Sequence, residues 1–186
     1  MIRRNRMEEY KEHEIKVLDV NIEEVSKKLE EIGANKVYDD NRIITTFDTD
    51  DSWLKKQDKL VRITEEDGTK VTMHVNNSNP ETKEVIKYKI SRKKEQQDFF
   101  LQLGIKPIAK VQAYRKSYEL GTIDFDIDKF PAIPAFLEID VKGLNSKQVK
   151  ELIEKLEISN NKIVILGTEQ IHDLYGVDYF KEYRYV

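Results

Sequence analysis

Acidic and basic side chains recur at every second position in two short segments that lie far apart along the chain. Glu12, Glu14 and Lys16 are separated by single residues, and Glu138 and Asp140 repeat this spacing much later. Side chains i and i+2 of a β-strand project from the same face, so each set presents its charges in one direction. Carboxylates bind hard divalent cations, and a lysine binds phosphate as a point charge. The two segments therefore predict a site for a metal ion and a phosphate group.

The composition favours one cytoplasmic domain. The chain has 186 residues, for which a single domain is the default, with a flexible stub at 1–10 and a C-terminal tail at 177–186. The 32 Lys and Arg nearly cancel the 35 Asp and Glu, which removes the simple electrostatic argument for a nucleic-acid partner. Cysteine is absent, and no apolar run reaches the length of a membrane span or a secretory signal. We expect a monomer or homodimer with neither nucleic-acid nor membrane partners.

Apolar residues recur with the period of an α-helix in some segments and with the period of a β-strand in others, and these patterns predict the elements that position the charges. Asn21 is the expected N-cap of an amphipathic helix that ends at Gly33, and Ser91 is the expected cap of a second helix that ends at Gly104. Strands joined mostly by hairpins favour an antiparallel sheet and the α+β class. We expect strands at 12–17, 42–49, 59–64, 70–76, 84–90, 111–120, 123–130 and 135–141, and further helices around 149–156 and 168–175.

Charged or polar residues recur on one face of most of these strands, while the opposite face is apolar. For any single strand, a polar face turned toward solvent is the simpler interpretation. Taken together, about eight such strands can close into a barrel whose interior holds one small ligand. We therefore predict a closed antiparallel eight-stranded β-barrel, a tunnel with flanking helices. Besides the first two segments, this polar set comprises Arg62, Thr64, Lys70, Thr72, His74, Lys87, Lys89, Arg115, Asp124, Asp126 and Asp128.

A charged tunnel restricts the ligand that it can hold. Unpaired charges in a confined interior cost several kcal/mol unless a partner or a metal ion neutralises them. Carboxylates and bases that share one lumen are compensated together by a polyanion with divalent cations.

The motifs resemble those of the CYTH family of triphosphate tunnel proteins, which includes class IV adenylate cyclases and thiamine or inorganic triphosphatases. The E-x-E-x-K pattern alone is common on exposed strands, but in register with the other motifs it is more specific. The resemblance covers most of the chain. It is carried by Glu12 to Lys16, Phe47-Asp48-Thr49, Leu60 to Thr64, Val71 to His74, Leu103-Gly104, Arg115, Asp128 and Phe136 to Asp140.

The resemblance implies a role for each matching residue. Glu12, Glu14, Glu138 and Asp140 would hold Mg²⁺ or Mn²⁺. The phosphate-binding residues would be Lys16, Arg62, His74, Lys87, Lys89 and Arg115. Lys16 would also be catalytic, together with Asp126 and Asp128, either of which would orient water or a second ion. The implied substrates are ATP, thiamine triphosphate or tripolyphosphate, and the reaction is either hydrolysis or cyclisation of ATP to cyclic AMP and pyrophosphate.

The chain departs from the family pattern at several of these positions. Thr64 replaces an arginine, His74 replaces a lysine, and Lys87 and Lys89 occupy the inward positions of a strand that normally carries acidic residues. These lysines favour an alternative function, a non-catalytic module that binds a nucleotide or polyphosphate. A purely structural or interaction protein is the third alternative.

Overall fold

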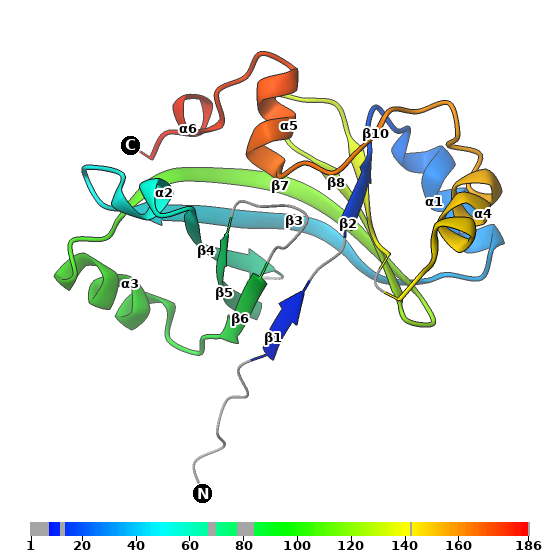
Figure 1. Ribbon diagram of the computed structural model, residues 1–186. Helices are drawn as coiled ribbons and strands as arrows, with labels where there is room; N and C mark the ends of the chain where they lie inside the picture. The colour runs from blue at the N-terminus through cyan, green and yellow to red at the C-terminus, as the bar shows by residue number, and fades with distance from the viewer. Residues whose placement is uncertain (1–7, 12–13, 67–69, 78–83, 142, 186) are drawn as a thin grey trace, which may run out of the picture.

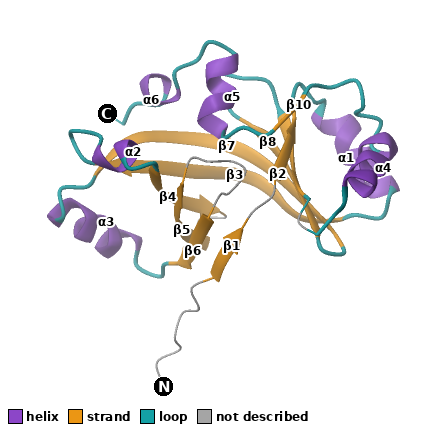
Figure 2. Cartoon of the chain, viewed as in Figure 1, coloured by secondary structure: helices purple, strands orange, loops and turns teal. Residues whose placement is uncertain are grey.

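One antiparallel sheet runs through the computed structural model, which describes residues 8–11, 14–66, 70–77, 84–141 and 143–185. Six helices of the described chain surround this sheet (Figures 1 and 2). The strands are β1 (Glu8–Lys11), β2 (Glu14–Val17), β3 (Asn35–Asp48), β4 (Lys59–Glu66), β5 (Lys70–Asn77), β6 (Glu84–Lys89), β7 (Lys106–Leu120), β8 (Ile123–Lys129), β9 (Phe136–Asp140) and β10 (Ile163–Val164). The helices are α1 (Ile22–Glu31), α2 (Trp53–Lys56), α3 (Lys93–Gln102), α4 (Ser146–Lys155), α5 (Thr168–Leu174) and α6 (Tyr179–Glu182).

The strand order is β1-β6-β5-β4-β3-β7-β8-β9-β2-β10, and every pairing is antiparallel. The α+β class is thus confirmed. Within the described ranges this order is linear, so hydrogen bonding does not close the sheet into the expected barrel. The described ranges contain ten strands rather than eight, because β1 lies before the first predicted strand at 12–17 and because β10 is added. β1 and β2 follow each other along the chain but pair with β6 and β9, far apart in the sheet order.

The termini of several elements follow the predicted capping chemistry. The Asn21 side chain accepts hydrogen bonds from the backbone N–H groups of Glu23 and Glu24, and Gly33 adopts a positive φ of 88° after α1. The second predicted cap is wrong: α3 begins after Arg92, and no side chain caps it. The flexible stub at 1–10 also needs correction, because residues 8–10 belong to β1 and pair with β6. No helix in the described ranges is long and apolar enough to cross a lipid bilayer.

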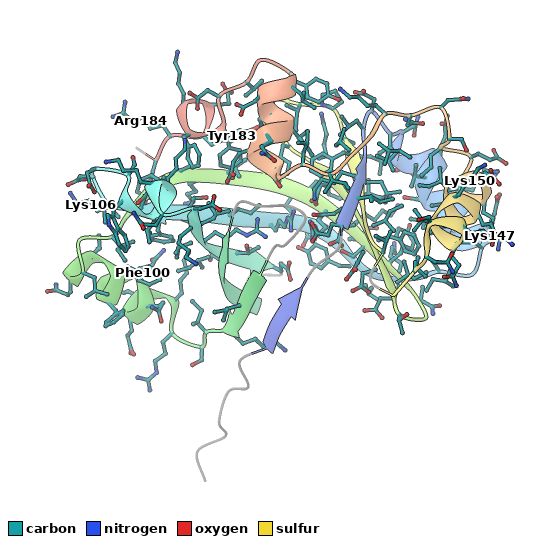
Figure 3. The ribbon with its side chains drawn as sticks, in the orientation of Figure 1. Phe100, Lys106, Lys147, Lys150, Tyr183 and Arg184 are labelled. Carbon is teal, nitrogen blue, oxygen red and sulfur yellow. The ribbon has the colours of Figure 1, made fainter. Side chains whose placement is uncertain are left out.

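One face of the sheet packs against helices through apolar side chains. At one end of the molecule, α1 and α4 lie side by side over this face and contribute Leu29 and Leu152 to its core (Figure 1). Toward the other end, Phe100 of α3 packs edge-on against Phe47 of β3, with 5.3 Å between the ring centroids (Figure 3). The sheet residues buried under α1 and α4 are Val17, Tyr118, Phe125, Ile127, Leu137 and Ile139.

The opposite face is divided into a charged part and an apolar part. The apolar part lies under α5, α6 and the residues that follow them, where Ile171, Tyr179 and Tyr183 pack on Ala109 and Val111 of β7. Backbone hydrogen bonds also attach the C-terminal segment to β7. Lys110 donates its N–H to the Tyr183 carbonyl at 2.8 Å, and the N–H of Tyr185 donates to the carbonyl of Ile108 at 3.0 Å. The C-terminal segment therefore covers one stretch of the sheet and leaves the charged stretch beside it.

We expect Leu137→Ala to lower the free energy of unfolding by about 2–5 kcal/mol, because Leu137 is fully buried between the sheet and the helices. Leu101→Ala on α3 is the matched control, since Leu101 is 49% exposed and should change stability by less than about 0.5 kcal/mol. Urea denaturation followed by circular dichroism measures both. Equal effects of the two substitutions would contradict the assignment of the core face.

Candidate functional site

Antiparallel register aligns four of the polar side chains in one row across the sheet. Ser117 of β7 is directly opposite Asp126 of β8, Asp126 is opposite Glu138 of β9, and Glu138 is opposite Lys16 of β2. Directly opposite residues share a face, and their Cβ atoms are about 5 Å apart. The alternation noticed in the sequence thus becomes a continuous row of functional groups, on the face opposite to the core under α1 and α4.

Lys16 lies at the end of this row between two carboxylates. Its Nζ is 2.9 Å from Glu14 Oε2 and 2.9 Å from Glu138 Oε1, and its side chain is 4% exposed. Burial alone would lower the pKa of Lys16, but attraction to Glu138 and Glu14 and the hydrogen bonds to both outweigh burial and raise it. Asp140 pairs with Glu14 in register, so its side chain lies on the same face of the sheet. The ammonium group is therefore permanently charged at physiological pH.

Arg115 connects two residues of this row, Asp126 and Glu138, to Asp128, which lies outside the row. Its Nη2 donates to Glu138 Oε2 at 2.9 Å, its Nε donates to Asp128 Oδ1 at 2.7 Å, and its Nη1 donates to Asp126. Burial would lower the pKa of this guanidinium, but Asp126, Asp128 and Glu138 raise it well above its ordinary value. One arginine fork thus holds three of the predicted acidic residues in place.

A second arginine, Arg42 of β3, completes the network. Its Nη2 lies 2.8 Å from both carboxylate oxygens of Asp128, which is 1% exposed. Asp128 is therefore enclosed by two guanidinium groups. Arg42 is not among the residues predicted from the sequence, because it stands at the first position of the predicted strand 42–49 and precedes an apolar run. Its alternation with Ile44 and Thr46 was the available signal.

The surroundings of Asp126 raise the pKa of its carboxyl group. Burial raises the pKa of its carboxyl group, Arg115 lowers it, and the negative charges of Asp128 and Glu138 raise it again. Ser117, which is also not among the residues predicted from the sequence, donates a hydrogen bond to Asp126 Oδ1 and lowers this pKa in part. The net pKa lies above the ordinary value of 3.8. A carboxyl group with a raised pKa next to fixed cations is suited to accept a proton from water or to orient it.

The remaining predicted phosphate ligands belong to the other half of the sheet. Register places Thr46, Arg62, His74 and Lys87 directly opposite one another across β3, β4, β5 and β6. Arg62 lies near enough to Arg42 for its charge to lower the pKa of that residue. The side chains of His74 and Lys87 lie outside what the structure describes, and Lys89 is exposed. The charge of Arg62 thus links this half of the sheet to the charged network.

The predicted metal ligands are present in part. Glu14 and Glu138 lie on either side of Lys16, whereas Glu12 falls outside the described residues. In the ranges that the structure describes, no three His, Asp or Glu side chains are arranged as a ready-made metal cage. Mg²⁺ commonly takes only one or two carboxylates and completes its octahedron with phosphate oxygens and water. The hard oxygen donors of Glu14 and Glu138 fit such an ion.

The model of a known protein family matches most of this chain. The model of the CYTH domain matches residues 10–175, a range that contains all the described residues of the charged network. The comparison with curated proteins gave no match.

Several solved structures share the fold. A candidate adenylate cyclase from Vibrio parahaemolyticus is 16% identical, with a TM-score of 0.67 over 82% of this chain and 90% of its own. A conserved hypothetical protein from Pyrococcus furiosus is 17% identical, with a TM-score of 0.67 over 84% of this chain and 97% of its own. A candidate adenylyl cyclase from Hippeastrum, described as having a dominant triphosphatase activity, is 12% identical, with a TM-score of 0.62 over 88% and 95%.

We expect the carboxyl group of Asp126 to titrate above 3.8 in the metal-free protein, measured by ¹³C NMR of its Cγ. Ser117→Ala should raise this midpoint further, because it removes a hydrogen bond that favours the ionised form. A pKa that folding raises favours the protonated form in the folded state, so this residue's contribution to stability falls as pH rises through its folded-state pKa.

Ser91→Ala, an exposed substitution outside the charged network, is the matched control and should leave the midpoint unchanged. A midpoint at or below 3.8 in the unsubstituted protein would contradict the electrostatic description of Asp126.

Proposed function

This chain belongs to the CYTH domain family, and on that premise we propose that it hydrolyses a triphosphate substrate with the help of a divalent cation. The observation that carries the proposal is the buried row of alternating charges, in which Lys16 and Arg115 connect Glu14, Glu138, Asp126 and Asp128. Phosphoryl transfer depends mainly on positioning and charge neutralisation, and the cations and carboxylates of this row are suited to both tasks.

We propose further that the sheet curves into an eight-stranded tunnel around this row. The support comes from the chain path. β1 and β2 are separated only by residues 12–13, yet the first pairs with β6 and the second with β9. One continuous segment thus connects distant parts of the sheet order. If β1 and β2 count as one strand and β10 lies outside, eight strands surround the charged face, the number whose interior just holds a small ligand.

In this proposal the cation binds between the protein carboxylates and the substrate. Glu14 and Glu138 would hold Mg²⁺ or Mn²⁺, with Glu12 and Asp140 as further ligands. When bound, the cation neutralises negative charge on the phosphate oxygens. The two carboxylates remain oriented without it, because Lys16 holds both of them at 2.9 Å.

The basic residues bind the phosphate chain. Lys16 offers a point charge at one end of the row, and Arg115 offers a planar fork near its middle. Both keep their charge, because the adjacent carboxylates raise their pKa values. Asp128 accepts hydrogen bonds from Arg115 and Arg42, so we assign it to the positioning of these arginines. We assign the orientation of the attacking water to Asp126, the carboxyl group with the raised pKa.

Hydrolysis is favoured over cyclisation by what occupies the rest of this face. Cyclisation of ATP requires a pocket that holds the adenosine so that its 3′-hydroxyl attacks the α-phosphorus. The apolar stretch that adjoins the charged row is filled by Ile171, Tyr179 and Tyr183 of the chain itself. We therefore propose that the site recognises mainly the triphosphate group, as carried by tripolyphosphate, thiamine triphosphate or ATP.

Glu14→Gln tests the proposal, because it keeps the volume of the side chain and removes its charge. We expect Mg²⁺- or Mn²⁺-dependent phosphate release from tripolyphosphate, ATP and thiamine triphosphate to fall by on the order of a hundredfold. The malachite-green assay measures release, and immunodetection of cyclic AMP from ATP measures the competing reaction. Glu31→Gln on α1, half exposed, is the matched control.

Unchanged turnover in the Glu14 variant would reject its role as a metal ligand. Binding of tripolyphosphate without any turnover would replace the hydrolase with a non-catalytic binding module, and cyclic AMP as the main product would replace hydrolysis with cyclisation.

A further inference from the structure

His172 of α5 is a fully buried titratable residue to which the proposed function assigns no role. Histidine is the side chain whose ordinary pKa lies within the physiological range, so small changes of environment change its charge. The ring contacts aromatic residues of the C-terminal segment that pack on the apolar stretch of the sheet. A change in its charge therefore acts on the attachment of this segment.

The hydrogen bonds of His172 identify its protonation state. Nδ1 is 2.8 Å from the backbone carbonyl oxygen of Thr168, which can only accept, so Nδ1 carries a proton. Nε2 is 3.2 Å from the hydroxyl group of Tyr183, and in a neutral ring it accepts a hydrogen bond from that group. The Tyr183 oxygen in turn accepts from the N–H of Ala132 at 3.3 Å. A neutral His172 thus gives every polar group of this relay a partner.

A second proton on the ring would break the relay. Nε2 would then donate instead of accept, and the O–H group of Tyr183 would lose the atom to which it donates. The rings of Phe130, Tyr179 and Tyr183 stand edge-to-face with the imidazole, at centroid distances of 5.1, 5.0 and 5.5 Å. Burial raises the pKa values of both tyrosines, so all three rings are uncharged. A positive charge buried among uncharged rings is costly.

Two acidic residues on the helices act on His172 in the opposite direction. Burial lowers its pKa, whereas the hydrogen bond to Thr168 and the charges of Asp173 on α5 and Glu182 on α6 raise it. Burial outweighs them, and the pKa lies below the ordinary value of 6.5. The docked ring thus binds its second proton more weakly than a ring in water. The stabilisation is fully present above pH 6.5 and is lost as the pH falls from there toward the lowered pKa.

The segment that His172 contacts is also the one that pairs with β7. Residues 178–185 comprise α6 and the residues after it, and α5 and α6 both lie over β7 in Figure 1. The carbonyl of Tyr183 accepts the backbone hydrogen bond of Lys110, and Tyr185 donates another to β7. The residue that bonds to the imidazole through its side chain therefore bonds to the sheet through its backbone.

We propose that His172 makes the attachment of residues 178–185 sensitive to pH, so that the neutral ring holds this segment on β7 and proton uptake at Nε2 releases it. The proton comes from the solvent and returns to it when the segment docks again. Release uncovers the apolar stretch beside the charged row, which includes Ala109 and Val111. The device does not depend on the reaction proposed above, because none of its residues belongs to the charged row.

Hydrogen exchange at single amides, measured by NMR, tests the release. We expect the protection factors of the Lys110 and Tyr185 amides to fall between about pH 7.5 and about pH 5, by at most about tenfold per pH unit because one proton is taken up. The amide of Ile139, in a fully buried residue of the central strand β9, is the matched control and should keep its protection. An equal loss at Ile139 would indicate global unfolding and would overturn the proposal.

His172→Phe separates the titration of the ring from its packing, because phenylalanine remains aromatic and takes up no proton. Protection of the Lys110 and Tyr185 amides should then be the same at both pH values. If this variant does not fold, His172→Phe combined with Tyr183→Phe undergoes the same measurement, since removal of both hydrogen-bond partners together is better tolerated than removal of one. An acid-induced loss of protection as large as in the unsubstituted protein would overturn the role of His172.

The midpoint of His172 itself gives a readout that a purely structural role would not change. Imidazole ¹³C shifts should titrate below 6.5 in the unsubstituted protein. Glu182→Gln should lower this midpoint further, because it removes a negative charge that favours the protonated ring. A midpoint at or above 6.5, or one that Glu182→Gln raises, would contradict the proposal.

Discussion

The mutual neutralisation of buried charges on one face of the sheet is the constraint on which the rest of the structure depends. Lys16, Glu138, Arg115, Asp128 and Arg42 form a chain in which each member contacts the next. Each buried charge would cost several kcal/mol alone, so removal of one member leaves its neighbour uncompensated. A sheet that must bury such a chain needs strands whose register aligns opposite charges. This requirement explains why the site is built from five different strands rather than from loops.

Register also explains why the two faces can differ so strongly. A shift of one residue in β8 or β9 would turn Ile127 and Leu137 toward the charged face and Asp126 and Glu138 into the apolar core. Both faces therefore oppose the same error, one through lost burial and the other through unpaired charge. The long strands extend this difference between the two faces along the sheet. β3 and β7 pair along nearly their whole lengths and carry residues of the charged row, of the apolar stretch and of the core.

Much of this arrangement could be predicted from local patterns. Alternation placed Glu14, Lys16, Asp126 and Glu138 on one face, and the cap at Asn21 followed from its chemistry. The features that could not be predicted depend on contacts between residues far apart in the sequence. Arg42 gains its role only because β3 lies next to β7, and the position of the aromatic tail depends on an edge that appears only when β7 extends beyond β8. The short strand β10 has only two residues, too few for any periodic signal.

The unequal lengths of β7 and β8 have a consequence for the behaviour of the protein in solution. Register pairs β8 with residues 114–120 of β7. Residues 106–113 of β7 extend beyond β8, so β8 does not cover the edge of this stretch that faces away from β3. The backbone at 183–185 occupies that edge through the hydrogen bonds of Lys110 and Tyr185. An uncovered edge of this kind is a template for strands from other molecules. The C-terminal segment thus protects the sheet against intermolecular strand addition and aggregation.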